Sequence, residues 1–338
     1  MIKIKIKNQT QGRRTRIYTS IIGAMEVCSP SASKTFKTHN TCFSKEALVR
    51  IAEIWNMKAA TNNNKRYGPI KGISRKSANQ LWHDINARMT QPCQGSGREW
   101  CWIDKLGTEA KSTAVIASSL RPVTPREWYK KPYTWLSNYD IAAVMKQYDV
   151  VADASYNYKF LGVFPIDFTS KDEMGQCLYS EICQLDLSKF IRKGVKYIGL
   201  ITNMDKHDEP GSHWTSTFVC IDPNTRCYGG YYYDSVSRET PESVTEFFAV
   251  VQKQLAKLYP QSVAVFNTDY SKQVEQRGNT ECGMFSIAYQ LRWLKALRKK
   301  QTALLSDVLK TKMNDAYVHK LRKTLFIPSA TEVVKPLK

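Results

Sequence analysis

The stretch ECGMFSIAYQLRWLKALRKK, residues 281–300, decides which fold we expect for this chain of 338 residues. Its apolar residues recur at helical spacing and predict a long amphipathic helix; the stripe includes Phe285, Ile287, Ala288, Leu291 and Leu294. Cys282 lies in the first turn of this helix. A thiol there meets the positive end of the helix dipole, and a neighbouring imidazolium would lower its pKa further. The stretch therefore predicts a nucleophilic cysteine at a helix start.

Two further dipeptides, His213-Trp214 and Asp234-Ser235, couple a polar side chain to a strand end. The runs 215–222 and 226–235 read as strands, and the turn residues between them make the pair a hairpin. His213 opens the first strand and Asp234 ends the second, so both side chains are expected at the same edge. Asp222 is the rival acid, but Asp222-Pro223-Asn224 is ordinary turn chemistry.

Gly283 and Gln276 complete a set of residues for acyl transfer. Gly283 would let the backbone approach a substrate carbonyl, and the Cys282 amide is a natural oxyanion donor. Gln276, six residues upstream, offers a second donor. Catalysis through a thioester needs a nucleophile, a base, an acid that orients the base, and donors to the oxyanion, and the sequence offers a candidate for each.

The remaining cysteines and histidines receive ordinary interpretations. Nine cysteines is an odd number, so at least one is free, and we expect reduced thiols in an intracellular chain. Eight of the nine read as small buried hydrophobes. Neither Cys93 with Cys101 nor Cys177 with Cys183 has zinc-ligand spacing, so no metal and no cofactor is expected. Four histidines are expected to be surface or packing residues: His39, His83, His207 and His319.

The ordered set His213-Trp214, Tyr233-Asp234-Ser235, Gln276 and Glu281-Cys282-Gly283 resembles the SUMO protease and adenovirus protease clan of cysteine peptidases. The resemblance implies an α+β, papain-like fold over about residues 155–328. It further implies that Cys282 is the nucleophile, His213 the base, Asp234 the orienting acid and Gln276 an oxyanion donor. Trp214 would pack beside the catalytic centre and contact substrate with Gly283. Glu281 departs from the commoner Asp, and the interval from His to Asp is slightly long.

A finer resemblance is to the branch of large DNA viruses, the African swine fever virus type of polyprotein-processing protease. The segments that carry it are 162–168, 279–285 and the helical region around 42–46. It implies cleavage of core or capsid polyproteins at Gly-Gly-Xaa or similar sites during virion maturation, in the virion and host cytoplasm. Two alternatives stay open: a deconjugase of SUMO or ubiquitin-like modifiers, and a catalytically silent, basic nucleic-acid-binding protein.

Composition and hydrophobic pattern along the chain predict four segments. They are a basic, mostly helical N-terminal domain (1–120), a connecting segment (121–154), the catalytic domain (155–328) and a tail (329–338). Helices are expected at 44–56, 74–89 and 135–148, and an edge strand or basic arm in the first twenty residues. The second part should be mixed α and β with largely antiparallel pairing. Its expected strands are 159–168, 195–202, 215–222, 226–235 and 262–270, and its expected helices 188–193, 241–258, 283–299 and 303–325.

Charge is concentrated in the two flanks of the chain, whose net charge is +20. Residues 1–110 carry 19 basic and 7 acidic side chains, and residues 291–338 carry 12 and 3. Basic flanks suit DNA or another polyanion, and equally a solvated surface. No apolar run approaches the roughly 20 residues of a membrane span, and the start lacks the apolar core of a signal peptide, so we expect a soluble intracellular protein without membrane partners.

Overall fold

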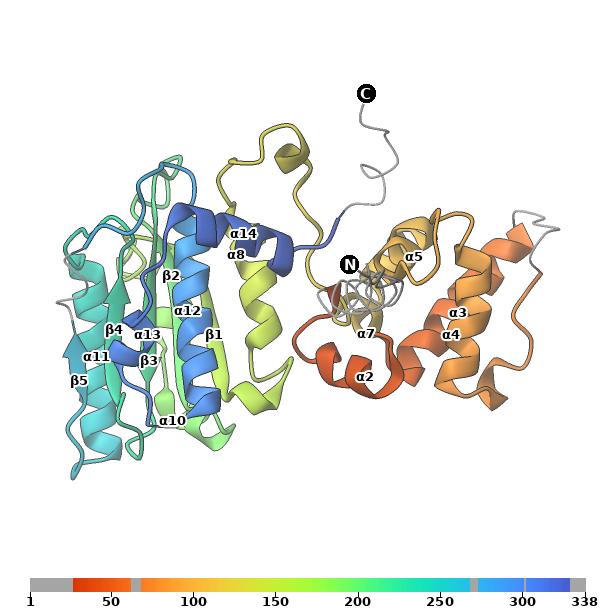
Figure 1. The fold of residues 1–338 in the computed structure, drawn as a ribbon. Helices are drawn as coiled ribbons and strands as arrows, with labels where there is room; N and C mark the ends of the chain where they lie inside the picture. Colours follow the sequence, from red (N-terminus) through yellow and green to blue (C-terminus); the bar gives the residue numbers. More distant parts are fainter. Residues whose placement is uncertain (1–26, 62–67, 268–272, 301, 329–338) are drawn as a thin grey trace, which may run out of the picture. The chain divides into compact units, whose positions relative to one another are not determined.

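A computed structural model describes residues 27–61, 68–267, 273–300 and 302–328. The chain divides into two compact units, one of residues 1–126 with 324–338 and one of residues 127–323 (Figure 1). The arm or strand predicted for the first twenty residues lies outside the described residues, as does the tail from 329 onward.

The first unit is helical over its described residues, as predicted. Its longest helix, α3 (Lys45–Thr61), begins where Ser44 Oγ accepts a hydrogen bond from the Ala47 amide. A full capping box between Ser77 and Gln80 starts α4 (Ala78–Met89). The other helices are α2 (Ala32–His39), α5 (Glu99–Leu106), α6 (Thr108–Ser112), α7 (Ala114–Ala117) and the 3₁₀ helix η1 (Ile73–Arg75).

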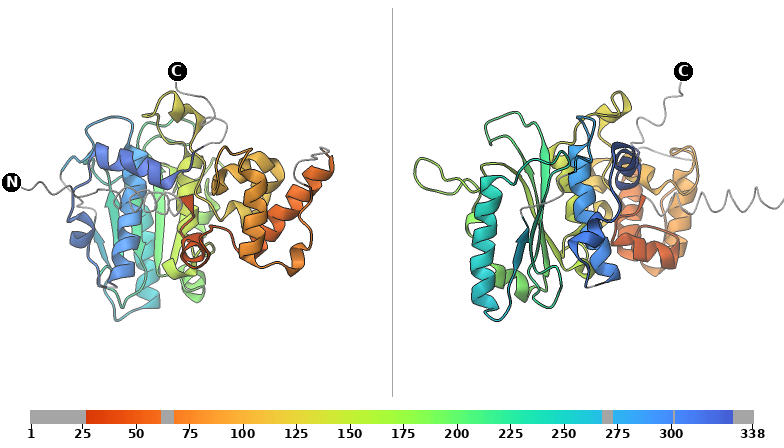
Figure 2. Two further views of the ribbon diagram at one scale, coloured as in Figure 1. Left: turned by 45° about the vertical axis from the view of Figure 1, so that its right-hand side comes forward. Right: turned by 60° about the vertical axis from the view of Figure 1, so that its left-hand side comes forward.

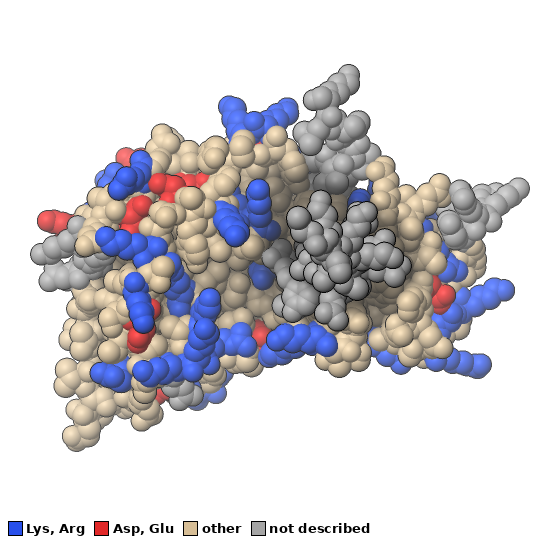
Figure 3. Space-filling model, in the orientation of Figure 1, with Lys and Arg blue, Asp and Glu red and all other residues tan. Residues whose placement is uncertain are grey.

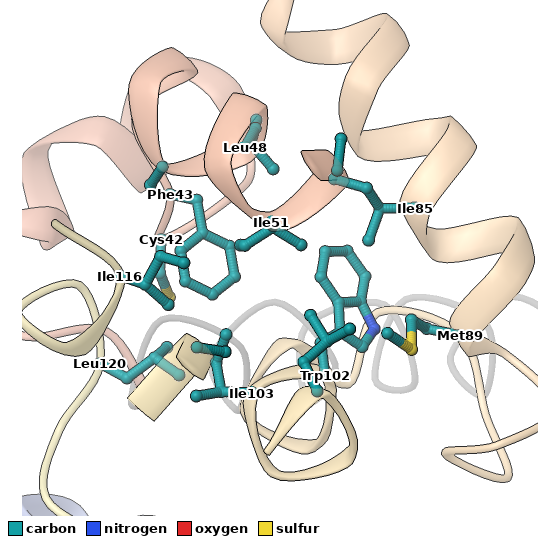
Figure 4. Packing of buried hydrophobic residues seen from close by; sticks show 14 of the residues in the cluster. Cys42, Phe43, Leu48, Ile51, Ile85, Met89, Trp102, Ile103, Ile116 and Leu120 are labelled. Carbon is teal, nitrogen blue, oxygen red and sulfur yellow. The ribbon is translucent and has the colours of Figure 1, made fainter. Parts of the chain in front are cut away.

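The core of the first unit forms where the apolar stripes of these helices meet (Figure 4). Phe43 stacks on the fully buried Trp102, with ring centroids 6.1 Å apart. Leu48 and Ile51 from α3 and Ile85 from α4 belong to the same buried cluster as these rings. Two disulfides, Cys28–Cys42 and Cys93–Cys101, join segments of the same unit.

The second unit is built on a five-stranded sheet in the order β1-β2-β3-β4-β5. The strands are β1 (Tyr158–Pro165), β2 (Tyr197–Asn203), β3 (Trp214–Cys220), β4 (Gly229–Tyr233) and β5 (Val265–Asn267). The predicted hairpin of β3 and β4 is confirmed. Pairing is antiparallel only at the centre, because β1 runs parallel to β2 and β5 parallel to β4. The prediction of largely antiparallel pairing is therefore wrong for both edges.

Helices cover both faces of the sheet. The right-hand view of Figure 2 shows α11 (Glu242–Leu258) on one face and α12 (Cys282–Lys299) on the other. Beside α12 lies α8 (Asn138–Met145). The remaining helices are α9 (Ser180–Cys183), α10 (Leu187–Arg192), α13 (Leu305–Leu309), α14 (Asp315–Leu325) and the 3₁₀ helices η2 (Arg126–Tyr129), η3 (Lys146–Tyr148) and η4 (Ala154–Tyr156). The single helix predicted for 303–325 is thus two helices, α13 and α14.

A buried amide fixes α12 against the sheet. Gln290 donates from Nε2 to Ser216 Oγ and to the Thr217 carbonyl, both at 2.8 Å, and its Oε1 accepts from the Tyr158 hydroxyl at 3.0 Å. A Cβ at Gly199 would lie 1.9 Å from that hydroxyl, so only glycine fits there. Because each partner is buried, a shift of α12 along the sheet would leave these polar groups unpaired. The network holds the middle of α12 in register with β3.

Six of the nine cysteines are paired, the third pair being Cys177–Cys183. The expectation that eight were reduced, buried hydrophobes is therefore wrong for these six. Their pairing depends on which loops meet in space, which spacing along the chain does not give. Cys220, Cys227 and Cys282 are free and buried, so the inference that at least one is free is confirmed. None of the helices in the described ranges is both long enough and apolar enough to span a membrane.

Candidate active site

His213 and Asp234 meet where β3 begins and β4 ends. The register that pairs Ser216 with Tyr233 brings the residue after β4 to the edge from which β3 starts. His213 Nε2 lies 2.6 Å from Asp234 Oδ1, and both side chains are buried. Backbone amides of Val236 and Arg238 also donate to the Asp234 carboxylate. The carboxylate is thereby fixed with one oxygen directed at the imidazole.

Cys282 is the first residue of α12, and its thiol lies near enough to His213 to contribute to the raised pKa of that imidazole. Because Nε2 of the imidazole is engaged by Asp234, Nδ1 is the nitrogen left for the thiol. The first amides of a helix have no intrahelical partner, so the Cys282 N–H is available to a ligand. The structure thus brings the three predicted residues into one chain of contacts.

The imidazole of His213 has a raised pKa of about 9. Burial lowers this pKa, but hydrogen bonds to Asp234 and Cys282 and the negative charge of both raise it further than burial lowers it. The imidazole is therefore protonated at neutral pH. A protonated His213 held by Asp234 carries the proton that a general acid must give to a leaving group.

Gln276 lies beside this group and is held by Ser235. The Ser235 hydroxyl donates to Gln276 Oε1 at 2.7 Å, and the Ser235 carbonyl accepts the amides of Glu275 and Gln276. Gln276 Nε2 donates to the Gly278 carbonyl at 2.7 Å. The predicted Gln276 is therefore oriented, and its partner Ser235 is a residue whose contact the sequence analysis missed.

Gly283 is buried and packed against two side chains. A Cβ there would lie 3.0 Å from Leu136 Cδ1 and 3.2 Å from Trp214 Cδ1. Trp214 donates from Nε1 to the Leu136 carbonyl, and its own carbonyl accepts the Ser286 hydroxyl. Close packing thus gives a second reason for glycine at this position, and it fixes Trp214 beside the start of α12.

Segment 133–136, predicted as part of a connection, lines the same region. Trp135 donates from Nε1 to the Asn279 carbonyl at 2.6 Å. Tyr133 stacks on His319 of α14 with ring centroids 4.5 Å apart. Leu136 forms the contact with Gly283 described above. A motif search could not find these residues, because each acts through its place in the fold.

Glu281, immediately before the thiol, is bound by α14. Arg322 contacts its carboxylate at 2.8 Å with both partners almost fully buried, and His319 Nδ1 lies 3.0 Å from the other oxygen. Arg322 also donates to the Thr134 and Thr280 carbonyls. The helix α14 therefore holds the loop that leads into α12.

The other candidates lie elsewhere. Asp222 pairs with Lys196 at 2.9 Å and accepts the Asn224 amide at the far turn of the hairpin, as turn chemistry predicts. His207 pairs with Asp167 on an exposed surface. The two cysteine pairs considered for zinc are disulfides. No cluster of three or more potential metal-ligating side chains occurs within the described ranges.

Two viral proteins are similar in sequence to the chain, while no protein-family model matches it. A protein of Acanthamoeba polyphaga mimivirus, provisionally named a thiol protease, is 28% identical over 285 residues, which is 80% of this chain and 85% of the relative. A protein of African swine fever virus that is named a cysteine protease is 25% identical over 199 residues, 56% of this chain and 67% of the relative.

The crystal structure of the African swine fever virus protease is similar with a TM-score of 0.51 and 17% identity, covering 90% of this chain and 96% of that one. The similarity in structure confirms the predicted fold, and the similarities in sequence confirm the predicted resemblance. The chain is thus similar along most of its length to viral proteins named as thiol proteases, and it has the α+β fold of the African swine fever virus enzyme.

Proposed function

We propose that the chain is a cysteine endopeptidase with Cys282 as nucleophile, His213 as acid and base, and Asp234 as the orienting group. The observation that carries this proposal is the chain of contacts from Asp234 through His213 to a thiol at a helix start. Similarity to proteins named as thiol proteases supports the same activity.

The reaction begins when the Cys282 thiolate attacks the scissile carbonyl carbon. The carbonyl oxygen becomes an oxyanion, which the Cys282 amide and the second N–H of the Gln276 amide stabilise. As the carbon–nitrogen bond breaks, His213 gives its proton to the leaving amine and a thioester remains. Water then attacks the thioester while His213 takes a proton, and hydrolysis restores the thiolate and the imidazolium.

The proposed substrate is a viral core or capsid polyprotein cut at Gly-Gly-Xaa or a similar small-residue site, during maturation in the virion and host cytoplasm. Trp214 lies beside Gly283, the residue after the thiol, and its indole donates to the Leu136 carbonyl, so a bulky, fixed wall borders the start of α12. Such a wall favours substrate residues without a Cβ. A Gly→Ala substrate series tests this selectivity, and equal rates along the series would refute it.

The activity is tested by incubating peptides that contain Gly-Gly-Xaa with the full chain and with Cys282→Ala. Cys227→Ala is the matched control, because Cys227 is another free, buried cysteine of the same unit. We expect the control to keep cleavage and Cys282→Ala to lose it. Cleavage confined to intact SUMO or ubiquitin precursors would assign a deconjugase instead. Cleavage that Cys282→Ala retains would refute the thiol mechanism.

A further inference from the structure

A groove of about 740 Å³ lies on the second unit, on the outer side of α12 and against α13 and α14. We call the six aliphatic residues of its lining the floor of the groove: Ala288, Leu291, Ala296, Ala303, Val308 and Leu321. A second hollow of about 470 Å³ shares Leu291, Lys295 and Lys299 with it. The C-terminal half of α12 is therefore a ridge with an apolar hollow on either side.

Cationic side chains border this groove, and Figure 3 shows them gathered over α12 and α13. Five of the groove residues are basic and one is acidic; the basic ones are Arg292, Lys295, Lys299, Lys300 and Lys310. The acidic one, Asp307, accepts the Leu304 amide at the start of α13. Arg292 is held by the Val308 carbonyl and the Tyr317 ring. Within the described ranges, the four lysines form no ion pair, so their charge is available to a partner.

The groove is separate from the thiol site. Lys295 lies thirteen positions after Cys282 in the same helix, which corresponds to about 20 Å along the axis at ~1.5 Å per residue. A partner bound there leaves Cys282 uncovered. A partner in the groove would therefore be recognised by the side chains that line the groove and not by those of the thiol site.

The chemistry of the groove favours a protein segment over a nucleic acid. An apolar floor is stabilised by apolar side chains, which a sugar–phosphate strand does not supply. The lysine border favours an anionic partner, and a protein segment supplies that charge as Asp and Glu carboxylates. We propose that the groove docks an acidic segment of a protein partner in which Asp and Glu alternate with large apolar residues. The proposal does not depend on the protease activity.

The test uses a fluorescent 14-residue peptide in which Asp or Glu alternates with Leu or Phe, titrated with the full chain carrying Cys282→Ala. We expect saturable binding that weakens at least tenfold in Lys295→Glu/Lys299→Glu. The matched control is Lys253→Glu/Lys257→Glu, which changes two exposed lysines at the same spacing on α11. We expect the control to bind as the parent does. Lys295→Gln/Lys299→Gln, checked by thermal melting, keeps the test valid if the charge reversal disturbs folding.

Two further probes separate the apolar floor from simple charge attraction. A peptide with every Leu and Phe replaced by Ser should bind at least tenfold more weakly, and a 20-base-pair DNA duplex should not compete for the groove. Equal binding of the Ser peptide, or equal loss in both lysine pairs, would overturn the proposal. Binding of the duplex alone, lost in Lys295→Glu/Lys299→Glu, would assign the groove to nucleic acid and also overturn it.

Discussion

The Ser235 hydroxyl donates to Gln276 Oε1 at 2.7 Å, and this bond decides which end of the Gln276 amide faces the site. With Oε1 engaged, Nε2 is directed the other way, where one of its N–H groups donates to the Gly278 carbonyl and the second remains for another acceptor. Ser235 follows Asp234 directly, so one dipeptide orients both the imidazole and the amide. Asp234 and Gln276 are thereby coupled through a single strand end.

Replacing Ser235 by Ala should lower kcat about tenfold with little change in KM. Loss of a whole oxyanion donor costs about 10²- to 10³-fold, and Ser235→Ala removes only the orientation of Gln276. Steady-state cleavage of a Gly-Gly-Xaa peptide gives both constants, and Ser235→Thr, which keeps the hydroxyl, should restore kcat. Ser188→Ala removes a hydroxyl bond elsewhere in the unit and serves as the control. An unchanged kcat in Ser235→Ala would contradict the positioning role.

Activity should fall as the pH rises through about 9, because the active pair needs a protonated His213 whose pKa is about 9. Because the fold raises the pKa of His213 to about 9, the imidazole keeps its proton below that pH and loses it above. Asp234→Asn removes a negative charge that raises this pKa, so the alkaline limb of kcat/KM should move to lower pH. A limb that stays in place would show that Asp234 does not set the charge of His213.

Removing Arg322 should destabilise the second unit strongly. Arg322→Met leaves the buried Glu281 carboxylate without its guanidinium partner, and breaking a buried pair costs about 3–5 kcal/mol. Urea unfolding measures the loss, and the double change Glu281→Gln/Arg322→Met should recover part of it. Lys189→Met removes the exposed pair with Asp186, which should cost less than about 1 kcal/mol. An equal loss of unfolding free energy in Arg322→Met and Lys189→Met would contradict the role of burial.

The unfolded but unreduced protein should take up three alkyl groups from iodoacetamide, one each on Cys220, Cys227 and Cys282. After reduction it should take up nine, because the other six cysteines form disulfides. Intact mass gives both numbers. Nine groups without reduction would show that the purified chain lacks these bonds.

Local patterns in the sequence predicted the helix at Cys282 and the hairpin that joins His213 to Asp234. Both depend on residues close together in the chain. The parallel direction of β1 and β5 could not be predicted, because alternation of apolar residues is the same for either direction. Arg322 and Trp135 were missed for a related reason. Each reaches the loop before Cys282 from a distant part of the chain, and only the fold makes them neighbours.

A peptide in which a vinyl sulfone replaces the bond after Gly-Gly tests whether His213 activates the Cys282 thiol. The reagent forms a stable adduct with an activated thiolate, which intact mass and peptide mapping locate. We predict one adduct per chain, on Cys282, with the rate falling at least a hundredfold in His213→Ala. An adduct on Cys220 or Cys227, or an equal rate in His213→Ala, would contradict the account.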